Sequence, residues 1–345
     1  MTMAVTILML CPKSKYTHRI SHISMSMNSY IAKRLLHTLL IAWGVMTAAF
    51  FLMRIGPHSP ADKYLATLGA GHNVSQVTAA IESRYGVDRP LYEQYFTYID
   101  SLLHGDWGWS FSASMPVSDL IRTHWVYSFQ LILLSSIFAI LLGIIIGIFS
   151  AARKDTAADH IATFFSFTGI SIPNFWLGMM LILIFSVKLG WFKTYYDTGL
   201  PMFSLSNLYA LILPVMTLAT GMVAGYSRYV RSAMLENMNR DFVRTARAKG
   251  LPESKVLTKH VFRNALLPVV TIIMLDMSGI FFGGAYITEV IFGIPGLGWM
   301  SLKAVFSDDY SVVLAVTLIG AFVTLLFNLI ADIAYTYLDP RIRYE

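Results

Sequence analysis

The sequence predicts an all-α integral membrane protein with six membrane-spanning helices. Hydrophobic residues make up 56% of the 345-residue chain and charged residues only 13%, whereas a soluble domain carries about 25% charged residues. Apolar runs of about 20 residues, the length that a helix needs to cross a bilayer, recur along the chain. Lys and Arg residues gather beside these runs rather than within them.

The apolar runs place the six predicted spans approximately at residues 30–53, 128–151, 161–187, 208–227, 266–287 and 312–338. Together they organise residues 28–345 into one transmembrane domain. Residues 1–27 precede it, and we interpret them as a poorly structured N-terminal extension. The segment 55–123 is the longest piece between spans. Its apolar residues recur at helical spacing from Leu91 to Leu102, which predicts an amphipathic helix at the membrane surface or a lid over the bundle.

The distribution of positive charge predicts the orientation of the chain. With the N-terminus inside, 18 of the 26 Lys and Arg residues fall in cytoplasmic segments and seven in outer segments. Cytoplasmic loops are enriched in Lys and Arg. We therefore expect a multi-pass protein of the cell membrane with both termini in the cytoplasm.

Composition also excludes several functions. The net charge of +6 does not indicate nucleic-acid binding, because the basic residues border the spans. A single cysteine, Cys11, excludes an internal disulfide. No Gly is followed by Lys, so the chain lacks a P-loop and no ATPase site or cofactor is expected on it. The nine histidines form no close pair, and no metal site is predicted.

Residues 228–263, called here the basic segment, contain nine Lys and Arg residues between two predicted spans. Asp241–Gly250 reads as a short helix, with Asp241 as its N-cap and Gly250 at the C′ position. Pro252 is suited to open a second short helix that runs toward His260. Helices this short are marginal alone, so the pattern indicates an element that docks on another protein.

The order of residues in this segment resembles the coupling loop of ABC importer membrane subunits. The stretch from Phe242 to Leu251 (Phe-Val-Arg-Thr-Ala-Arg-Ala-Lys-Gly-Leu) carries the resemblance, and His260, Arg263 and Asn264 match the dipeptide, oligopeptide and nickel branch. Gly105-Asp-Trp-Gly-Trp-Ser and Glu289-Val-Ile-Phe-Gly-Ile-Pro-Gly-Leu-Gly are also similar to that branch. The resemblance covers about residues 28–345.

The resemblance implies a type I ABC importer arrangement, in which this chain is the permease and forms half of a translocation path for di- and oligopeptides. It implies a second, homologous permease subunit, two cytoplasmic ATPases that bind ATP and Mg, and an external solute-binding protein. The residues it assigns to ATPase coupling are Arg244, Thr245, Ala246, Arg247, Gly250, Leu251, His260, Arg263 and Asn264.

Two acidic residues, Asp276 and Asp332, fall within predicted spans, where a charge is costly and suggests function. Asp276 shares its span with small residues at Ser278, Gly279 and Gly283. We expect these four residues to face the substrate path, with Asp276 meeting a peptide amine; a structural hydrogen bond to the partner subunit is the alternative. For Asp332 we expect a structural contact with a basic group.

Two weaker patterns are explained by ordinary structural roles. Gly143 and Gly147 are spaced for close helix packing, which we expect within this subunit. Asp308 and Asp309 resemble paired catalytic carboxylates, but they lack the further spaced acids of such sites and predict a solvated outer loop.

Other functions remain open at this point. A nickel or metal-chelate importer would use the same machinery. A secondary transporter would need no docking segment and commonly has several charged residues within its spans, and an intramembrane enzyme would need clustered polar groups near one membrane face.

Overall fold

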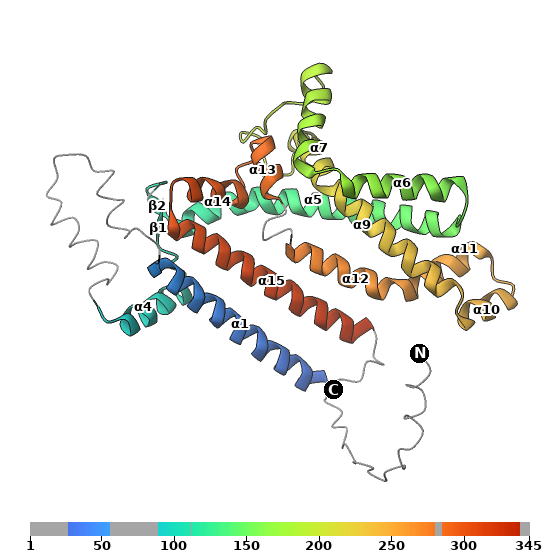
Figure 1. Ribbon diagram of the computed structural model, residues 1–345, viewed down its shortest axis with the longest axis horizontal. Helices are drawn as coiled ribbons and strands as arrows, with labels where there is room; N and C mark the ends of the chain where they lie inside the picture. The colour runs from blue at the N-terminus through green and yellow to red at the C-terminus, as the bar shows by residue number, and fades with distance from the viewer. Residues whose placement is uncertain (1–26, 56–88, 111, 280–284, 339–345) are drawn as a thin grey trace, which may run out of the picture.

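The computed structural model describes residues 27–55, 89–110, 112–279 and 285–338 (Figure 1). The predicted N-terminal extension lies outside these residues, except that Met27 is the first residue of α1. The described chain is mostly helical, as predicted, with one small two-stranded sheet.

The helices follow one another with short connections. They are α1 (Met27–Ile55), α4 (Leu91–Leu103), α5 (Val117–Ala152), α6 (Ala157–Ser171), α7 (Asn174–Leu181), α8 (Leu205–Ala210), α9 (Ile212–Met238), α10 (Asp241–Ala248), α11 (Glu253–Lys255), α12 (Phe262–Gly279), α13 (Tyr286–Phe292), α14 (Leu297–Phe306) and α15 (Tyr310–Leu338). Two π-helical stretches, Ile182–Lys188 and Val256–Val261, continue α7 and α11. Strand β1 (Trp109–Ser110) pairs antiparallel with β2 (Met115–Pro116).

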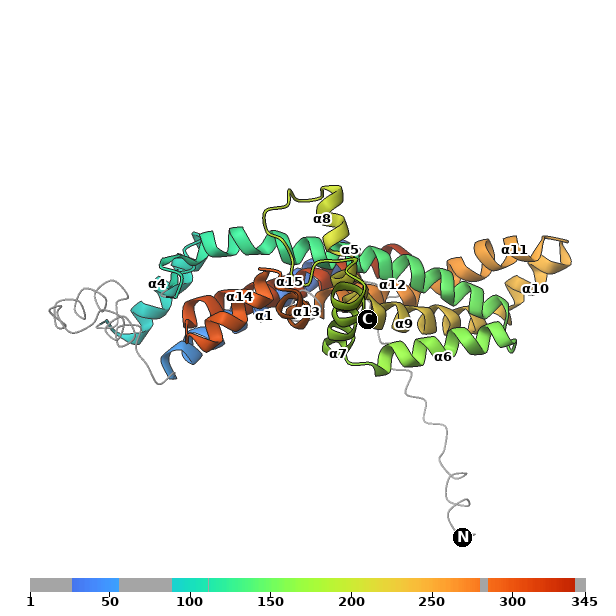
Figure 2. The same ribbon diagram turned by 90° about the horizontal axis from the view of Figure 1, so that it is seen from above.

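The long helices lie side by side in the order α1, α15, α12, α9 and α5, with α6 against the other side of α9 (Figure 1). Helix α4 lies at one end of the molecule and α10 at the opposite end (Figure 2). A very close contact joins α5 and α9, because a Cβ added at Gly147 would lie 2.6 Å from the Cβ of Val230. Gly143 likewise packs on Tyr226. The prediction that this glycine pair packs helices within the subunit is confirmed.

Among the described residues, α1, α5 and α15 are long and apolar enough to span a membrane, and there are up to six spans if each of three bent pairs counts as one. Two predicted spans are not single straight helices in the described part of the chain. The span at 161–187 bends by 101° between α6 and α7, since Pro173 lacks the N–H that would continue the helix. In the predicted span at 266–287, α12 is described as far as Gly279, and the short helix α13 begins at Tyr286.

Helix α9 is not among these apolar candidates, although its first part coincides with the predicted span at 208–227. It is packed between α5, α6 and α12, and it buries Thr217 and Ser227 as well as apolar residues. Small and polar side chains lower its hydropathy because this helix faces other helices on several sides.

Helix α4 confirms the helix predicted from the apolar spacing of residues 91–102. It packs on α1 through Tyr95, whose hydroxyl lies 2.7 Å from that of Thr47, and through Tyr98, whose ring lies 5.5 Å from that of Phe50. Burial raises the pKa of Tyr98 to about 12.

Candidate functional site

The basic segment begins differently from the prediction. Residues 228–238 are not a loop but the last turns of α9, and the chain leaves this helix only after Met238. Nonlocal packing on α5 and α6 extends the helix beyond the point where the apolar run ends. Arg228 and Arg231 are therefore helical residues that face α6, and the next helix, α10, starts at Asp241.

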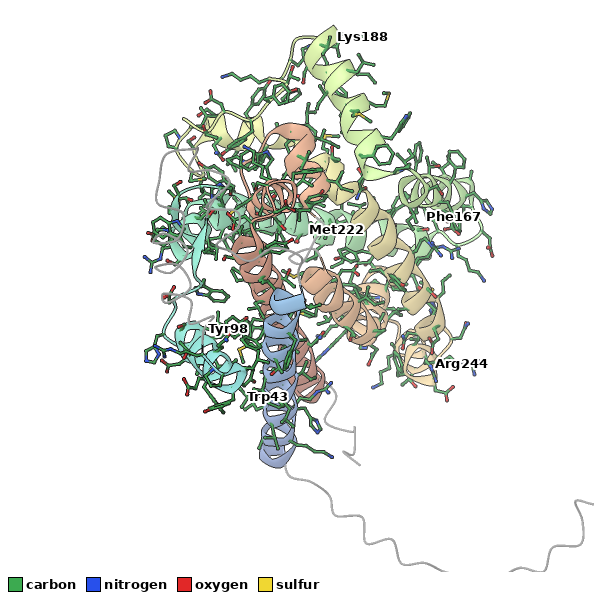
Figure 3. All side chains as sticks on the ribbon, turned by 60° about the vertical axis from the view of Figure 1, so that its left-hand side comes forward. Trp43, Tyr98, Phe167, Lys188, Met222 and Arg244 are labelled. Atoms are coloured by element: carbon green, nitrogen blue, oxygen red, sulfur yellow. The ribbon has the colours of Figure 1, made fainter. Side chains whose placement is uncertain are left out.

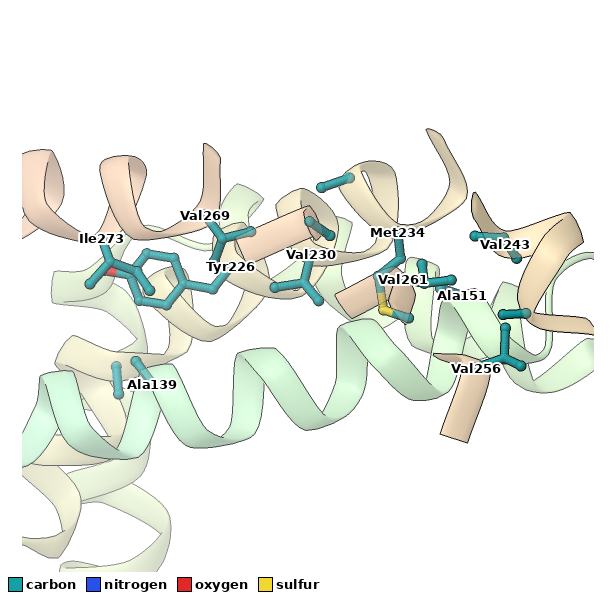
Figure 4. Packing of buried hydrophobic residues seen from close by; sticks show 14 residues of the cluster. Ala139, Ala151, Tyr226, Val230, Met234, Val243, Val256, Val261, Val269 and Ile273 are labelled. Carbon is teal, nitrogen blue, oxygen red and sulfur yellow. The ribbon is translucent and has the colours of Figure 1, made fainter. Parts of the chain in front are cut away.

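Helix α10 has one apolar face that is fully engaged with the rest of the chain. Val243 and Ala246 are buried, and they join Met234, Val256 and Val261 in the largest hydrophobic cluster (Figure 4). Arg244 and Thr245 are both exposed, and Arg244 lies at the edge of the fold (Figure 3). The structure thus presents a basic outer face on a helix that is held rigidly from behind.

Local sequence signals set both ends of α10. The predicted N-cap, however, is the wrong residue. Asp241 is the first helical residue rather than the N-cap, which is Arg240 and makes no side-chain capping hydrogen bond. An acidic residue in the first turn still interacts favourably with the helix dipole. At the other end Gly250 has φ of +74° and occupies the predicted C′ position.

Gly250 completes a Schellman motif. Its N–H donates to the carbonyl of Arg247 at 2.9 Å, and the N–H of Leu251 donates to the carbonyl of Ala246 at 3.4 Å. Leu251 then packs against the hydrophobic cluster. The chain reverses direction here with its orphan carbonyl groups satisfied.

A bidentate ion pair closes the turn. The Arg247 guanidinium donates to both carboxylate oxygens of Glu253, at 3.1 and 2.6 Å. Both side chains are about half exposed, so the pair contributes modestly to stability. Its main effect is to fix α10 against the start of α11.

The second predicted helix opens after Pro252 and runs toward His260, as expected, and the structure continues it beyond that residue. Residues 253–279 form a continuous helical path through α11, a π-helical stretch and α12. His260 is half-buried, whereas Arg263 and Asn264 are exposed, and the Asn264 amide donates to the His260 carbonyl at 2.7 Å. These three residues lie on the helix that connects α10 to Asp276.

A buried ion pair that the sequence did not reveal anchors this end of the fold. Arg231 on α9 donates from Nε and Nη2 to the two oxygens of Asp159 on α6, both at 2.7 Å. Ser150 at the end of α5 also donates to Asp159, and the backbone N–H of Asp155 does so at 3.0 Å. One carboxylate thus joins three helices. The pattern Thr156-x-x-Asp159 indicates a helix start, but no local signal identifies the arginine.

Of the predicted path residues, the structure describes the side chain of Asp276 alone. It is exposed on α12 and lies near Tyr226 on α9, whose buried hydroxyl has no hydrogen-bond partner within the described part of the chain. Ser278 and Gly279 end α12. The side chain of Ser278, residue Gly283 and the side chain of Asp332 lie outside the described part.

Two further buried carboxylates, those of Glu289 and Asp309, hold α14 in place. Glu289 on α13 accepts from Ser128 Oγ at 2.5 Å and from the backbone N–H of Trp299 at 2.9 Å. The negative charge of Glu289 thereby interacts favourably with the positive end of the α14 helix dipole. Ser128 in turn accepts from the N–H of Leu297 at 2.7 Å.

The prediction of a solvated loop at Asp308 and Asp309 is wrong for Asp309, which is 2% exposed. One of its oxygens accepts three hydrogen bonds, from Ser110 Oγ at 2.7 Å and from Ser112 N and Oγ at 3.0 and 2.8 Å. The carboxylate therefore ties the β1–β2 hairpin to the junction between α14 and α15.

Comparison with known proteins agrees with this architecture. The family described as "Binding-protein-dependent transport system inner membrane component" matches residues 143–344, more than half of the chain. The oligopeptide transport system permease protein AppB of Bacillus subtilis (strain 168) is 41% identical over 324 residues, which cover 92% of this chain and 100% of that protein.

Two other relatives have the same coverage, 92% of this chain and 100% of their own length. The oligopeptide transport system permease protein OppB of Haemophilus influenzae is 38% identical, and the glutathione transport system permease protein GsiC of Salmonella choleraesuis is 36% identical. A solved amino acid ABC transporter chain shares 16% identity at a TM-score of 0.48 over 64% of this chain and 94% of its own, too distant a likeness to bear on function. The chain thus belongs to the family of inner-membrane components of binding-protein-dependent transport systems, and it is a multi-pass permease subunit of an ABC importer.

Proposed function

We propose that this chain forms half of the translocation path of a type I ABC importer for di- and oligopeptides. It crosses the membrane six times, with both termini in the cytoplasm, and pairs with a second, homologous permease. Two cytoplasmic ATPases bind ATP and Mg, and an external solute-binding protein delivers the substrate. Residues 1–27 are an extension, and residues 28–345 form the transmembrane domain.

The observation that carries this proposal is the construction of α10. A helix of eight residues is too short to be stable alone, yet here its apolar face is buried and its basic face is presented outward. This arrangement is suited to a groove lined by acidic groups or helix C-termini on a partner. We assign ATPase coupling to the outward residues of α10, to the turn at Gly250 and Leu251, and to His260, Arg263 and Asn264.

The relatives support a peptide substrate, because their names refer to oligopeptide and glutathione transport. A nickel or metal-chelate importer is the rival. Uptake measured with the cognate binding protein, competed by a peptide, by glutathione and by Ni²⁺, separates these substrates. Competition by Ni²⁺ alone would reject the peptide assignment.

We further assign the path to the end of α12, with Asp276, Ser278, Gly279 and Gly283 facing it and Asp276 meeting a peptide amine. Tyr226 supports this role because a buried hydroxyl without a hydrogen-bond partner among the described residues lies near Asp276. The variant Asp276→Asn should transport poorly while the assembled complex keeps its basal ATPase activity. Unchanged transport by Asp276→Asn would leave Asp276 a structural residue.

The coupling role is tested at Gly250, where an added Cβ would meet nothing within 4 Å. Asp and Asn tolerate positive φ similarly, so Gly250→Asp and Gly250→Asn differ chiefly in charge. Gly250→Asp should weaken ATPase association and ATP-dependent uptake about tenfold, with normal membrane insertion. Gly250→Asn is the matched control and should retain most of both. Full uptake by Gly250→Asp would contradict the assignment.

A further inference from the structure

Arg228 occupies an unusual position for a charged side chain. It lies within α9, ten residues before the helix ends at Met238. Its neighbours Ser227 and Val230 pack on Gly147 of α5, which is five residues before the end of that apolar helix. Arg228 is therefore about 8 Å inside the end of α5, within the depth that an apolar span occupies.

The guanidinium does not reach toward the cytoplasmic end. It lies over the ring of Phe167 on α6, 4.7 Å from the ring centroid. Phe167, on the edge of the fold in Figure 3, follows Ser166, whose hydroxyl meets that of Ser227 at 2.9 Å. The side chain thus folds back toward the N-terminus of α9, as helical side chains do.

No carboxylate among the described residues pairs with Arg228, and the residue is exposed. Arg231, one turn further along α9, shows the contrast, since its charge is neutralised by Asp159. An unpaired cation at this depth is costly in lipid and marks an ion or substrate pathway.

The surroundings of Arg228 leave room for a ligand. The bend between α6 and α7 forms an open groove of about 540 Å³, whose walls include Phe164, Phe167, Phe175 and Trp176 and the hydroxyl residues Thr168 and Ser171. On the same face of α9 as Arg228, a Cβ added at Gly225 would meet nothing within 4 Å. At Gly221 it would meet only the Asn174 amide oxygen, at 3.9 Å. Phe167 links the two features, since it lines the groove and its ring lies under the Arg228 guanidinium. The cation therefore lies beside the aromatic walls and hydroxyl groups of the groove.

We propose that Arg228 and this groove form a subsite that binds the carboxylate of the transported peptide. The inference rests on the proposed function, since a carboxylate is the one anion that every linear peptide with a free C-terminus carries. A guanidinium binds a carboxylate through two parallel hydrogen bonds. The aromatic walls accept apolar peptide side chains without selecting among them.

The test compares a peptide with its C-terminal amide in proteoliposomes that contain the complete importer. The ratio of free-acid to amide uptake is measured at saturating, preloaded binding protein for the unsubstituted chain, Arg228→Gln and Arg228→Lys. The binding protein is the same throughout, so its own preference cancels between variants. Arg153→Gln is the matched control, because Arg153 also stacks on an aromatic ring, that of Phe149 at 4.2 Å, but lies just past the end of α5.

We expect Arg228→Gln to lower the acid-to-amide ratio about tenfold, as for the loss of one charge-assisted hydrogen bond. Arg228→Lys should restore part of the ratio, and Arg153→Gln should not change it. An equal loss of acid and amide uptake would overturn the proposal. It would indicate that Arg228 contacts the partner subunit instead of the peptide. A loss that appears only in liposomes with anionic lipid would overturn it in favour of a lipid phosphate. If the unsubstituted complex imports neither peptide, the proposed function itself fails.

Discussion

The ion pair between Asp159 and Arg231 gives the most direct test of how the end of the bundle near α10 is held together. The substitution Asp159→Asn keeps the size of the side chain and removes its charge. Asp159 is 2% exposed and Arg231 28% exposed, so the variant leaves a largely buried guanidinium without its counter-charge. Two bonds of 2.7 Å from the guanidinium are weakened at once.

Breaking a buried pair by removing one partner costs about 3–5 kcal/mol. Arg231 retains some hydration through its exposed fraction, and we therefore expect Asp159→Asn to lower the free energy of unfolding by about 2–3 kcal/mol. The matched control is Glu236→Gln, which breaks an exposed pair of Arg240 and Glu236 with a 2.9 Å contact. Such a surface pair contributes about 0.5 kcal/mol.

Both variants are compared by denaturant unfolding of the purified protein in one detergent. The double variant Asp159→Asn with Arg231→Gln should lose less stability than the two single variants added together, because the unpaired charge is gone. A loss for Asp159→Asn no larger than that for Glu236→Gln would refute the reasoning.

Three further outcomes follow from close contacts. Gly147→Ala should force α5 and α9 apart and lower the yield of monodisperse protein in size-exclusion chromatography, whereas Gly44→Ala in α1, with nothing within 4 Å of the new Cβ, should not; equal yields would contradict this packing. Ser128→Ala should cost about 1–3 kcal/mol in the same unfolding assay, because Glu289 loses a donor; unchanged stability would refute it. Asp309→Asn should speed proteolytic cleavage within residues 109–116, and an unchanged rate would refute its role there.

Local signals in the sequence predicted the parts of the fold that depend on neighbouring residues. Gly250 ends α10 at the expected position because a left-handed C′ residue follows directly from chain geometry. Pro252 opens the next helix for a similar reason. The limits of α1 and α15 agree with the apolar runs within a few residues, since lipid exposure demands apolar side chains over the whole length.

Contacts between distant residues could not be predicted from a single sequence. Glu289 and Asp309 find their partners 161 and 197–199 residues away, and nothing near them in the chain identifies Ser128 or Ser110. The basic segment was misplaced at its start for the same reason. Arg228 follows an apolar run and reads as a loop residue, yet packing on α5 and α6 continues the helix past it.

The unbroken helical path from Glu253 to Gly279 also has a mechanical consequence. Its first arm, residues 253–266, is about 20 Å long and meets the second arm at a bend of 52°. Because Arg247 clamps α10 to the start of this arm, a tilt of α10 by about 10° would carry the far end of the arm through roughly 3–4 Å by lever geometry. Displacement of that size at the bend, next to Pro268, is comparable to the diameter of a water molecule. We therefore expect a small rotation of α10 to displace the chain at the bend, on the far side of which Asp276 lies.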